Sequence, residues 1–468
     1  MKYTLLYILG LAIFLTACYK DKGNYDYHPI GEPVISNFDT LYTAVVGDSL
    51  IIRPKVVLPS GNTKYQGHWT ISVPGQMYAE EYDGQNLEIV FGLGAGRYPA
   101  VLAVYDSVYK MKYFYNFVIK ATTAFSQGMI VLSDAGSYSA ISFIKPSGEV
   151  QPNVYTAINQ DTLPPGAVQL AMMKNVNYGN LITGYWAAYS TGGVLLDPGT
   201  LQRTKKLQQN FYSDPGPLTV TRLDGVTIGV PVAIMNHKMY VGAMETAPFA
   251  TYYGYFGVPL SGNYELGKPL IGNNPEASGY WLGYETSKQK LVRMDWRNYL
   301  DTNYVMRDSA FNPKQLKMTV WHMDKFNDNE CYAFCDSAGS VRELRFGLEF
   351  MDPGKDPVFH AYAKRKPVIA AQINASTVWA ASPVGVFFFT QGDKIFRYNP
   401  LNQEVKPLAT SFDGKTIGML KILENGNKLL VGASGSIAYL DISVGHNGDK
   451  IKQIDGIPGI PVDVIIRE

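Results

Sequence analysis

Cys18 is the residue whose type and spacing most directly predict chemistry. It closes the tetrad LTAC at positions 15–18, which has the spacing of a lipobox. Lys2 supplies a positive start, and the apolar run Leu5–Leu15 has the length of a signal-peptide core but is too short to span a bilayer. Small residues before the cysteine suit signal peptidase, and the cysteine then accepts acyl chains. We predict a signal peptide at residues 1–17 and lipidation of Cys18; the alternative is an ordinary signal peptide with an incidental cysteine.

The familiar catalytic motifs are absent from the sequence. It contains no GxSxG, no HExxH, no P-loop and no GxGxxG between a strand and a helix. The stretch Gly92–Gly96 precedes an expected strand, so we interpret it as a turn rather than a phosphate cradle. The six histidines show no metal-ligand spacing and stand at positions 28, 68, 237, 322, 360 and 446. We predict no catalytic residue, no metal and no cofactor.

Three weaker clusters of reactive side chains have simpler interpretations. The segment Asp324–Glu330 offers oxygen ligands for calcium, but it lacks the spacing and the glycine of an EF-hand, which favours a solvated turn. The carboxylates within residues 80–83 could serve glycoside hydrolysis, although their adjacency favours an ordinary loop. Cys331 and Cys335 would lie about 13 Å apart along a strand, beyond the limit of about 7 Å for a disulfide, so we predict free thiols.

Clusters of aromatic residues are the better candidates for ligand binding. Exposed Tyr and Trp rings stack on sugars or hold extended peptides, whereas the alternative is packing in the core. The chain has 33 tyrosines, most of which fit simple β composition. The clustered candidates that we predict to bind ligand are Tyr185, Trp186, Tyr252, Tyr253, Tyr255, Tyr280 and Trp281.

The charge balance excludes two classes of partner. The chain has 41 basic and 40 acidic residues, and removal of residues 1–17 takes away Lys2, which leaves 40 of each. A balanced chain argues against nucleic-acid binding and against a polybasic membrane patch. With 468 residues, the protein is long enough for two or three domains with sizeable cores.

Residues 33–122 are predicted to form a β-sandwich. Short alternating runs are separated by glycine, proline and asparagine, and Trp69 falls where a sandwich core needs a large aromatic. The sequence GRYPAVLAVYD at Gly96–Asp106 follows a glycine turn, and Tyr98 at its start resembles the tyrosine corner of sandwich folds. The whole passage resembles a strand of PKD and other immunoglobulin-like modules.

Residues 123–468 are predicted to form a β-propeller, which makes the chain all-β. Strand-like runs group into seven units of about 49 residues, close to the length of a propeller blade. Seven blades are favoured and eight remain possible. The last run, residues 461–466, has no partner after it, so we expect it to pair with Met129–Leu132 and close the ring, which removes exposed strand edges.

The order of these features resembles PKD-like family lipoproteins of Bacteroidetes. The most specific parts are the sequence ACYKDKGNY at residues 17–25 and the strand Gly96–Asp106. The resemblance covers essentially the whole chain, with residues 18–32 as the lipidated cysteine and its tether. It implies a lipid anchor in the outer membrane facing the cell exterior, beside a SusC-like TonB-dependent transporter and a SusD-like lipoprotein. It supplies no catalytic residues.

Two functional hypotheses follow from these observations. The first is a non-catalytic accessory component of a SusC/SusD-type uptake complex that binds peptide or glycan. The second is a surface hydrolase or lyase that uses the propeller as its scaffold and acts on glycan or peptide, which requires a funnel lined by carboxylates or by a histidine with acidic partners. A structural adhesin, with the sandwich as a spacer, is a third option.

Overall fold

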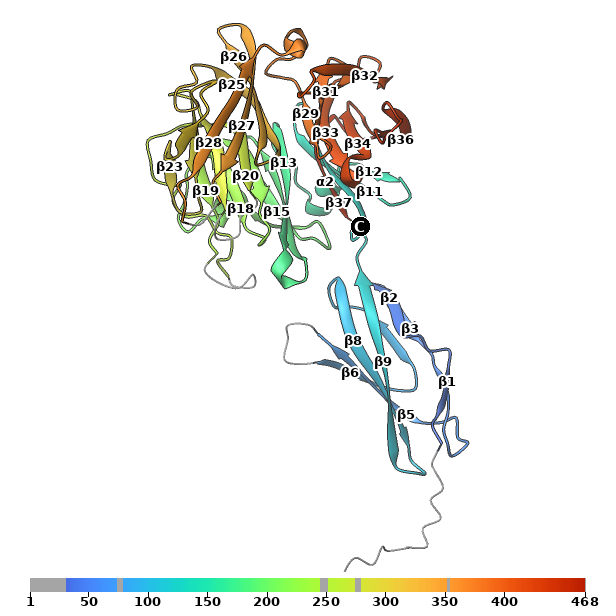
Figure 1. Ribbon diagram of the computed structural model, residues 1–468. Coiled ribbons are helices and arrows are strands. Elements are labelled where there is room, and N and C mark those ends of the chain that lie inside the picture. Colours follow the sequence, from blue (N-terminus) through green and yellow to red (C-terminus); the bar gives the residue numbers. More distant parts are fainter. Residues whose placement is uncertain (1–30, 74–78, 245–250, 274–278, 352–353, 468) are drawn as a thin grey trace, which may run out of the picture. The chain divides into compact units, whose positions relative to one another are not determined.

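The computed structural model describes residues 31–73, 79–244, 251–273, 279–351 and 354–467, so the predicted signal peptide, Cys18 and most of the tether lie outside the described residues. The chain divides into two compact units, Met1–Ala121 and Thr122–Glu468. The first unit is a sandwich and the second a propeller (Figure 1). No helix within the described ranges is long and apolar enough to cross a membrane.

The sandwich is built from one five-stranded sheet and two strand pairs. The large sheet has the order β2 (Leu41–Val45), β9 (Met111–Thr122), β8 (Gly96–Asp106), β5 (Gln66–Ser72) and β6 (Ala79–Asp83). The pairs are β3 (Ser49–Ile52) with β7 (Leu87–Val90), and β1 (Val34–Ser36) with β4 (Lys55–Val57). Strand β8 alternates buried and more exposed residues, because only one face of its sheet covers the core.

The two sequence markers of the sandwich are confirmed. The Trp69 ring is fully buried, and its Nε1 donates to the Gly84 carbonyl at 2.9 Å. The Tyr98 hydroxyl donates to the Gly94 carbonyl at 2.7 Å, which is the hydrogen bond of a tyrosine corner. Each hydrogen bond joins a core side chain to the backbone of a turn. The bonds therefore fix the positions of the strands that flank the two turns.

The second unit contains seven sheets in the part of the chain that is described. The first blade consists of β37 (Ile460–Arg467), β10 (Gly128–Asp134), β11 (Ser139–Ile144) and β12 (Val150–Gln151). The second consists of β13 (Ala167–Asn175), β14 (Leu181–Tyr189), β15 (Gly192–Leu196) and β16 (Arg203–Lys206). The third consists of β17 (Val220–Gly225), β18 (Pro231–Met235) and β19 (Lys238–Val241). The fourth and fifth are β20 (Leu266–Asn273), β21 (Tyr280–Glu285), β22 (Lys290–Met294) and β23 (Tyr299–Asp301); and β25 (Thr319–Asn327), β26 (Glu330–Ser337), β27 (Ser340–Glu349), β28 (Val358–Arg365) and a parallel β24 (Val305–Arg307). The last two are β29 (Trp379–Ser382), β30 (Val386–Gln391), β31 (Lys394–Asn399) and β32 (Glu404–Ser411); and β33 (Ile417–Leu423), β34 (Lys428–Ala433), β35 (Ser436–Asp441) and β36 (Asp449–Asp455).

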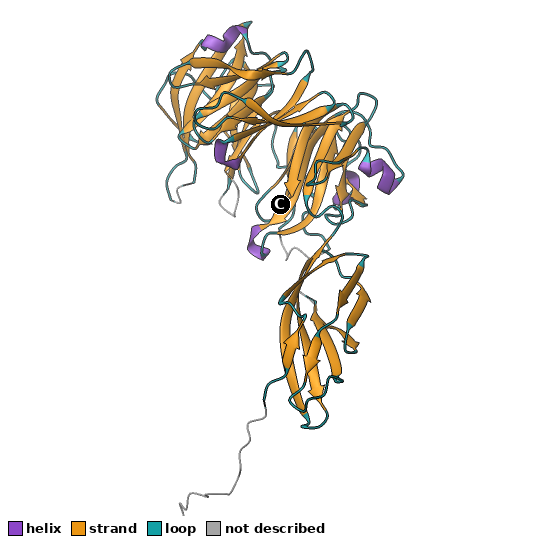
Figure 2. Cartoon of the chain, turned by 90° about the vertical axis from the view of Figure 1, so that its right-hand side faces the viewer, coloured by secondary structure: helices purple, strands orange, loops and turns teal. Residues whose placement is uncertain are grey.

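Among the described residues, short helices occur only in connections of the second unit (Figure 2). They are α2 (Val154–Asn159) and the 3-10 turns η1 (Val176–Tyr178), η2 (Leu207–Asn210), η3 (Val368–Ala371) and η4 (Glu424–Gly426). The predicted all-β architecture, a sandwich followed by a seven-bladed propeller, is therefore confirmed.

The ring closes through the last strand, as the sequence predicts. Strand β37 pairs antiparallel with β10, with Val464 opposite Val131 and Ile466 opposite Met129. Around the ring, each of the inner strands β37, β13, β17, β20, β25, β29 and β33 contacts the next, and β33 contacts β37. The first blade is thus assembled from both ends of the propeller.

The sequence predicts a strand at Tyr252–Pro259 as the partner of the run Val232–Ala243, and this prediction is wrong. The segment forms turns with isolated bridges at Phe256. Gly254 adopts a φ of 76°, the left-handed region, and this conformation breaks an extended strand. The segment therefore leaves the sheet and becomes a surface loop between β19 and β20.

Candidate ligand-binding groove

Four of the seven aromatic residues predicted to bind ligand lie in the protein core. Tyr185, Trp186, Tyr280 and Trp281 are each at most 5% exposed. They belong to β14 and β21, where successive residues are buried because the neighbouring blades cover both faces of the sheet. Trp281, for example, packs against Trp296 with ring centroids 5.3 Å apart. The prediction that these four rings are available to a ligand is wrong.

The other three predicted residues lie in the loop between β19 and β20. The Tyr252 side chain is 58% exposed, and Tyr255 is partly exposed. Their rings pack against each other at 5.3 Å and against Tyr212, from the connection before β17, at 5.7 and 5.9 Å. We name Tyr212, Tyr252 and Tyr255 the tyrosine cluster. Its rings support one another from the sides and remain partly open to solvent.

A buried amide holds the loop that carries the cluster. Asn210 is 2% exposed, and its Nδ2 donates to the Gly254 carbonyl at 2.8 Å. The backbone N–H of Phe256 donates to the Asn210 carbonyl at 2.8 Å. The Lys205 ammonium donates to Asn210 Oδ1 at 2.8 Å and lies 4.3 Å from the centre of the Tyr255 ring, a cation–π contact. Burial lowers the pKa of Lys205.

Tyr253 points away from solvent and anchors the loop. Its hydroxyl donates to the Ile228 carbonyl at 2.6 Å and lies 3.4 Å from Asn175 Nδ2. Ile228 belongs to the connection between β17 and β18, so this bond ties the tyrosine loop to the inner part of the third blade. Tyr253 therefore positions the loop, whereas Tyr252 and Tyr255 present ring surface.

A groove of about 930 Å³ lies beside the tyrosine cluster. Tyr212 and Tyr255 form part of its wall, together with Asn177 from the β13–β14 connection and the turn Trp296–Arg297 from the β22–β23 connection. Three blades therefore contribute to it. Val258, which is 85% exposed, lies on its lining. We name this cavity the tyrosine groove.

Arg297 gives the tyrosine groove a positive group. Its backbone N–H donates to Asp295 Oδ1 at 2.8 Å, which fixes the turn, while its side chain is exposed. Within the described residues, no carboxylate pairs with its guanidinium. Aromatic rings, amides and one guanidinium together suit the apolar faces and hydroxyls of a sugar chain, or the rings and carbonyls of an extended peptide.

Sequence reasoning missed Tyr212, Trp296 and Arg297. They reach the groove from different blades, and no local pattern connects them. The available signals were turn sequences: Tyr212 precedes Ser-Asp-Pro-Gly-Pro, and Trp296 follows an aspartate that caps a tight turn.

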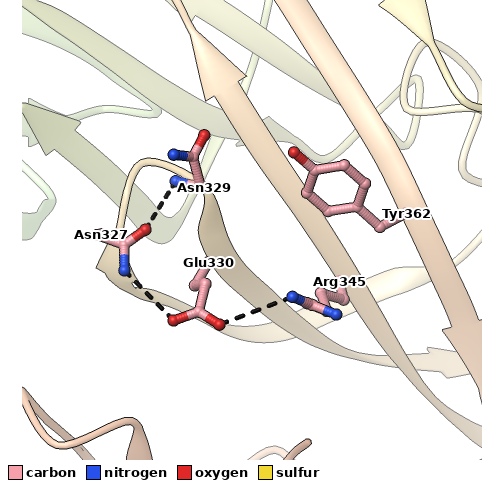
Figure 3. A pocket seen from close by; sticks show the side chains of 5 residues that line it. All are labelled: Asn327, Asn329, Glu330, Arg345 and Tyr362. Atoms are coloured by element: carbon pink, nitrogen blue, oxygen red, sulfur yellow. Dashed lines mark hydrogen bonds and ion pairs between the residues drawn. The ribbon is translucent and has the colours of Figure 1, made fainter.

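A second pocket of about 500 Å³ is lined by residues of the segment Asp324–Glu330, for which the sequence favours a solvated turn over a calcium site (Figure 3). The Glu330 carboxylate lies between Asn327, whose Nδ2 donates to it at 3.3 Å, and Arg345 at 3.6 Å. Asp328 pairs with the Lys325 ammonium at 2.7 Å. Both carboxylates therefore have cationic partners. Across the described residues, no group of three or more His, Cys, Asp or Glu side chains is arranged to hold a metal ion.

The remaining reactive clusters are structural. Cys331 and Cys335 are buried free thiols on β26, and burial raises the pKa of both, that of Cys335 to about 12. The carboxylates within residues 80–83 were predicted to lie in a loop, but they lie on strand β6. Asp83 on this strand pairs with His68 at 2.7 Å. The edge of a sheet accommodates them because their side chains alternate between its faces.

The inner strands of the propeller hold carboxylates that are already paired. Asp224 accepts from Arg222 Nε at 2.5 Å and from Gln169 at 2.6 Å. Asp463 accepts from the Leu170 N–H at 3.0 Å and from the Lys421 ammonium at 3.3 Å. Each carboxylate has a cationic partner and a second donor, so both link neighbouring blades rather than stand free for acid–base chemistry.

Residues 18–165 match the PKD-like family. The match covers the sandwich and continues through the first outer strands of the propeller, so the family region includes the junction between the two units. A search of curated proteins gives no match.

Among solved structures, the chain is similar to a quinonprotein alcohol dehydrogenase-like protein from Bacteroides thetaiotaomicron, with 13% identity, coverage of 93% of this chain and 99% of that one, and a TM-score of 0.45. It is also similar to the extracellular domain of a putative one component system from B. thetaiotaomicron, with 9% identity, coverage of 91% and 68%, and a TM-score of 0.41. Dihydro-heme d1 dehydrogenase NirN matches with 13% identity, coverage of 78% and 72%, and a TM-score of 0.40. These structural similarities are too distant to assign a function to this chain.

Proposed function

We propose that this protein is a lipid-anchored, non-catalytic component of a SusC/SusD-type uptake system on the outer membrane, facing the cell exterior, and that it holds an extended glycan or peptide in the tyrosine groove. The observation on which this proposal rests is the tyrosine cluster: three tyrosine rings, packed together and partly exposed, beside a groove of about 930 Å³.

The support of the cluster favours binding. Asn210 holds the loop from below, Tyr253 ties it to the third blade, and Lys205 lies against Tyr255. The rings are therefore fixed before a ligand arrives, and a preorganised surface loses less conformational entropy on binding. The loop rests on a buried amide and a partly buried ammonium, a support that a loop serving only to fill space would not need.

Two observations favour capture over catalysis. The groove lining contains a guanidinium, amides and rings, and no aspartate or glutamate is among its lining residues. The inner-strand carboxylates Asp224 and Asp463 are each paired with a cation. A hydrolase of glycans needs two carboxyl groups that face a shared bond.

The proposed location and partners rest on the N-terminal sequence. The lipobox ends at Cys18, and the match to the PKD-like family starts at that residue. The resemblance to lipoproteins of Bacteroidetes implies a transporter barrel and a SusD-like lipoprotein beside the chain. A capture protein placed next to such a barrel would raise the local concentration of its substrate.

The binding test uses the double variant Tyr252→Ala and Tyr255→Ala. The probes are gels that contain soluble starch, mannan or β-glucan, and immobilised peptides from a casein digest. Removal of two stacking rings should weaken binding by about tenfold or more on the probe that retains the wild-type chain. Tyr109→Ala, which removes a similarly exposed tyrosine from the sandwich, is the matched control and should bind normally.

Equal retention of the double variant and the wild type would exclude the tyrosine groove as the binding site. The partner proposal has a separate test, which is purification of the native chain from outer membranes. Recovery of the uptake barrel and its SusD-like lid without this chain would contradict it. Release of shortened glycan or peptide by the wild type would contradict the non-catalytic role.

A further inference from the structure

The free end of the β8–β9 hairpin exposes a group of apolar residues. Its turn covers residues 107–110. Val108 is 57% exposed, Tyr109 45%, Met111 38% and Phe114 63%. Exposure of large apolar side chains to water costs free energy, and groups of them mark surfaces for a partner or a membrane. We name Val108, Tyr109, Met111 and Phe114 the hairpin cluster.

Two lysines alternate with the hairpin cluster. Lys110 and Lys112 are both exposed and have no carboxylate partner within the described residues. Apolar side chains interleaved with lysines fit the headgroup region of a lipid bilayer, where the apolar parts enter the acyl boundary and the ammonium groups reach lipid phosphates. The tyrosine suits the same depth, because its ring is apolar and its hydroxyl is polar.

The hairpin end is preformed. The Asp106 side chain is fully buried and accepts the backbone N–H groups of Val108 at 2.9 Å and Tyr109 at 3.5 Å. Lys110 adopts the left-handed backbone conformation with a φ of 53°, which completes the turn. Val108 and Tyr109 therefore project from a fixed turn rather than from a loose loop, and Met111 and Phe114 follow it on β9.

The chain enters the sandwich at this same end. Strand β1 starts two residues after Glu32, and burial followed by the Glu32 carboxylate raises the pKa of Tyr115 on β9. The first described residues lie beside the free end of the hairpin, and β9 leaves the sandwich at its other end (Figure 1). Val34 and Val57, paired neighbours on β1 and β4, add further exposed apolar surface.

We propose that the hairpin cluster and its two lysines rest in the headgroup layer of the membrane in which Cys18 is anchored, and this inference rests on the proposed lipidation. The 13 residues that follow Cys18, through Gly31, span at most about 45 Å when fully extended. A tether of that reach alone allows many orientations. A second contact at the hairpin fixes the sandwich with its β1 end against the bilayer.

The test measures sedimentation of the chain from Tyr19 to Glu468, which has both units and no acyl group, with lipid vesicles. One set of vesicles contains phosphatidylethanolamine and phosphatidylglycerol, and the other contains phosphatidylcholine alone. We expect binding to the anionic vesicles that decreases as salt increases. The variant Val108→Ser, Tyr109→Ser, Phe114→Ser should bind at least about tenfold more weakly, because three apolar side chains no longer leave water.

The control replaces three equally exposed apolar residues elsewhere on the sandwich: Leu41→Ser, Ile51→Ser and Val90→Ser. It should bind vesicles like the wild type. Matching thermal melting of both triple variants shows that folding is intact. Equal vesicle binding by wild type and hairpin variant would overturn the proposal, as would retention by the detergent-solubilised uptake barrel without any binding to vesicles.

The proposed lipid anchor and the proposed hairpin contact are tested by separate measurements. The mass of the chain isolated from cells reports whether Cys18 is acylated, which tests the proposed lipoprotein. The vesicle assay uses a chain without Cys18, so its result depends on the hairpin alone. Acylation with no vesicle binding rejects the hairpin contact and leaves the anchor in place.

Discussion

Replacement of Arg365 with methionine should destabilise the propeller far more than replacement of Glu343 with glutamine. Glu343 on β27 is 1% exposed and pairs with Arg365 on β28 at 2.5 Å. The hydroxyl of Tyr398, on β31 of the next blade, donates to the same carboxylate. Arg365 also donates to the Pro400 carbonyl of that next blade. The pair thus joins the fifth and sixth blades.

The two substitutions leave different groups behind. Without the guanidinium, the carboxylate is buried and unpaired, which costs about 3–5 kcal/mol. Glutamine at position 343 removes the buried charge and keeps an acceptor for Tyr398, while Arg365 retains Pro400 and some water. We expect that variant to lose about 1 kcal/mol or less. The measurement is urea unfolding of the full chain at neutral pH, followed by tryptophan fluorescence and circular dichroism.

The pH dependence gives a second readout. Burial raises the pKa of Glu343 against the opposing effects of Tyr398 and Arg365, and loss of Arg365 should raise it further. A raised pKa means that the folded state binds the proton more tightly than the unfolded chain. The penalty of Arg365→Met should therefore be largest at neutral pH and shrink as the pH falls through the raised pKa of Glu343. Equal losses for both variants, or a penalty independent of pH, would refute this reasoning.

Three further outcomes are expected. Tyr98→Phe should lower the free energy of unfolding of the sandwich by about 1 kcal/mol, the value of one hydrogen bond, and an unchanged denaturation midpoint would contradict the tyrosine corner. Gly254→Ala should lower the melting temperature, because φ is 76° there and the new Cβ would lie 3.0 Å from Pro231; a normal melting curve would show that the loop relaxes freely. Cys331 and Cys335 should react with a thiol reagent at pH 8 only after denaturant unfolds the propeller, because both are buried with raised pKa values; rapid labelling of the native chain would contradict this.

The features predicted correctly from sequence are those encoded locally or by period. Trp69 and Tyr98 lie in alternating runs with a glycine turn nearby, so their burial and corner geometry follow from short-range pattern. The closing strand was predictable because an apolar run at 461–466 lacked a partner after it. The number of blades followed from the spacing of strand-like runs.

The ligand-binding residues were harder to predict for a physical reason. In a propeller, both faces of a blade pack against neighbours, so the middle strands lose the alternation that separates core from surface. Tyr185 and Tyr280 therefore resembled exposed aromatics in sequence and are buried in the structure. The groove residues Tyr212 and Arg297 come together only through the closed ring. The total charge of the chain is balanced, and a total does not show where charged residues lie. It therefore gave no indication of the two lysines at the end of the β8–β9 hairpin.

The pairing of β37 with β10 also constrains how the propeller is made. The first blade needs a strand that is synthesised after the other six blades, so the ring cannot close until residues 460–467 have been made and delivered. Until then, the edge of β10 stays available to any strand that reaches it. Closure of this unit must wait for its last strand, and an unpaired strand edge in an incomplete domain is a site of misassembly.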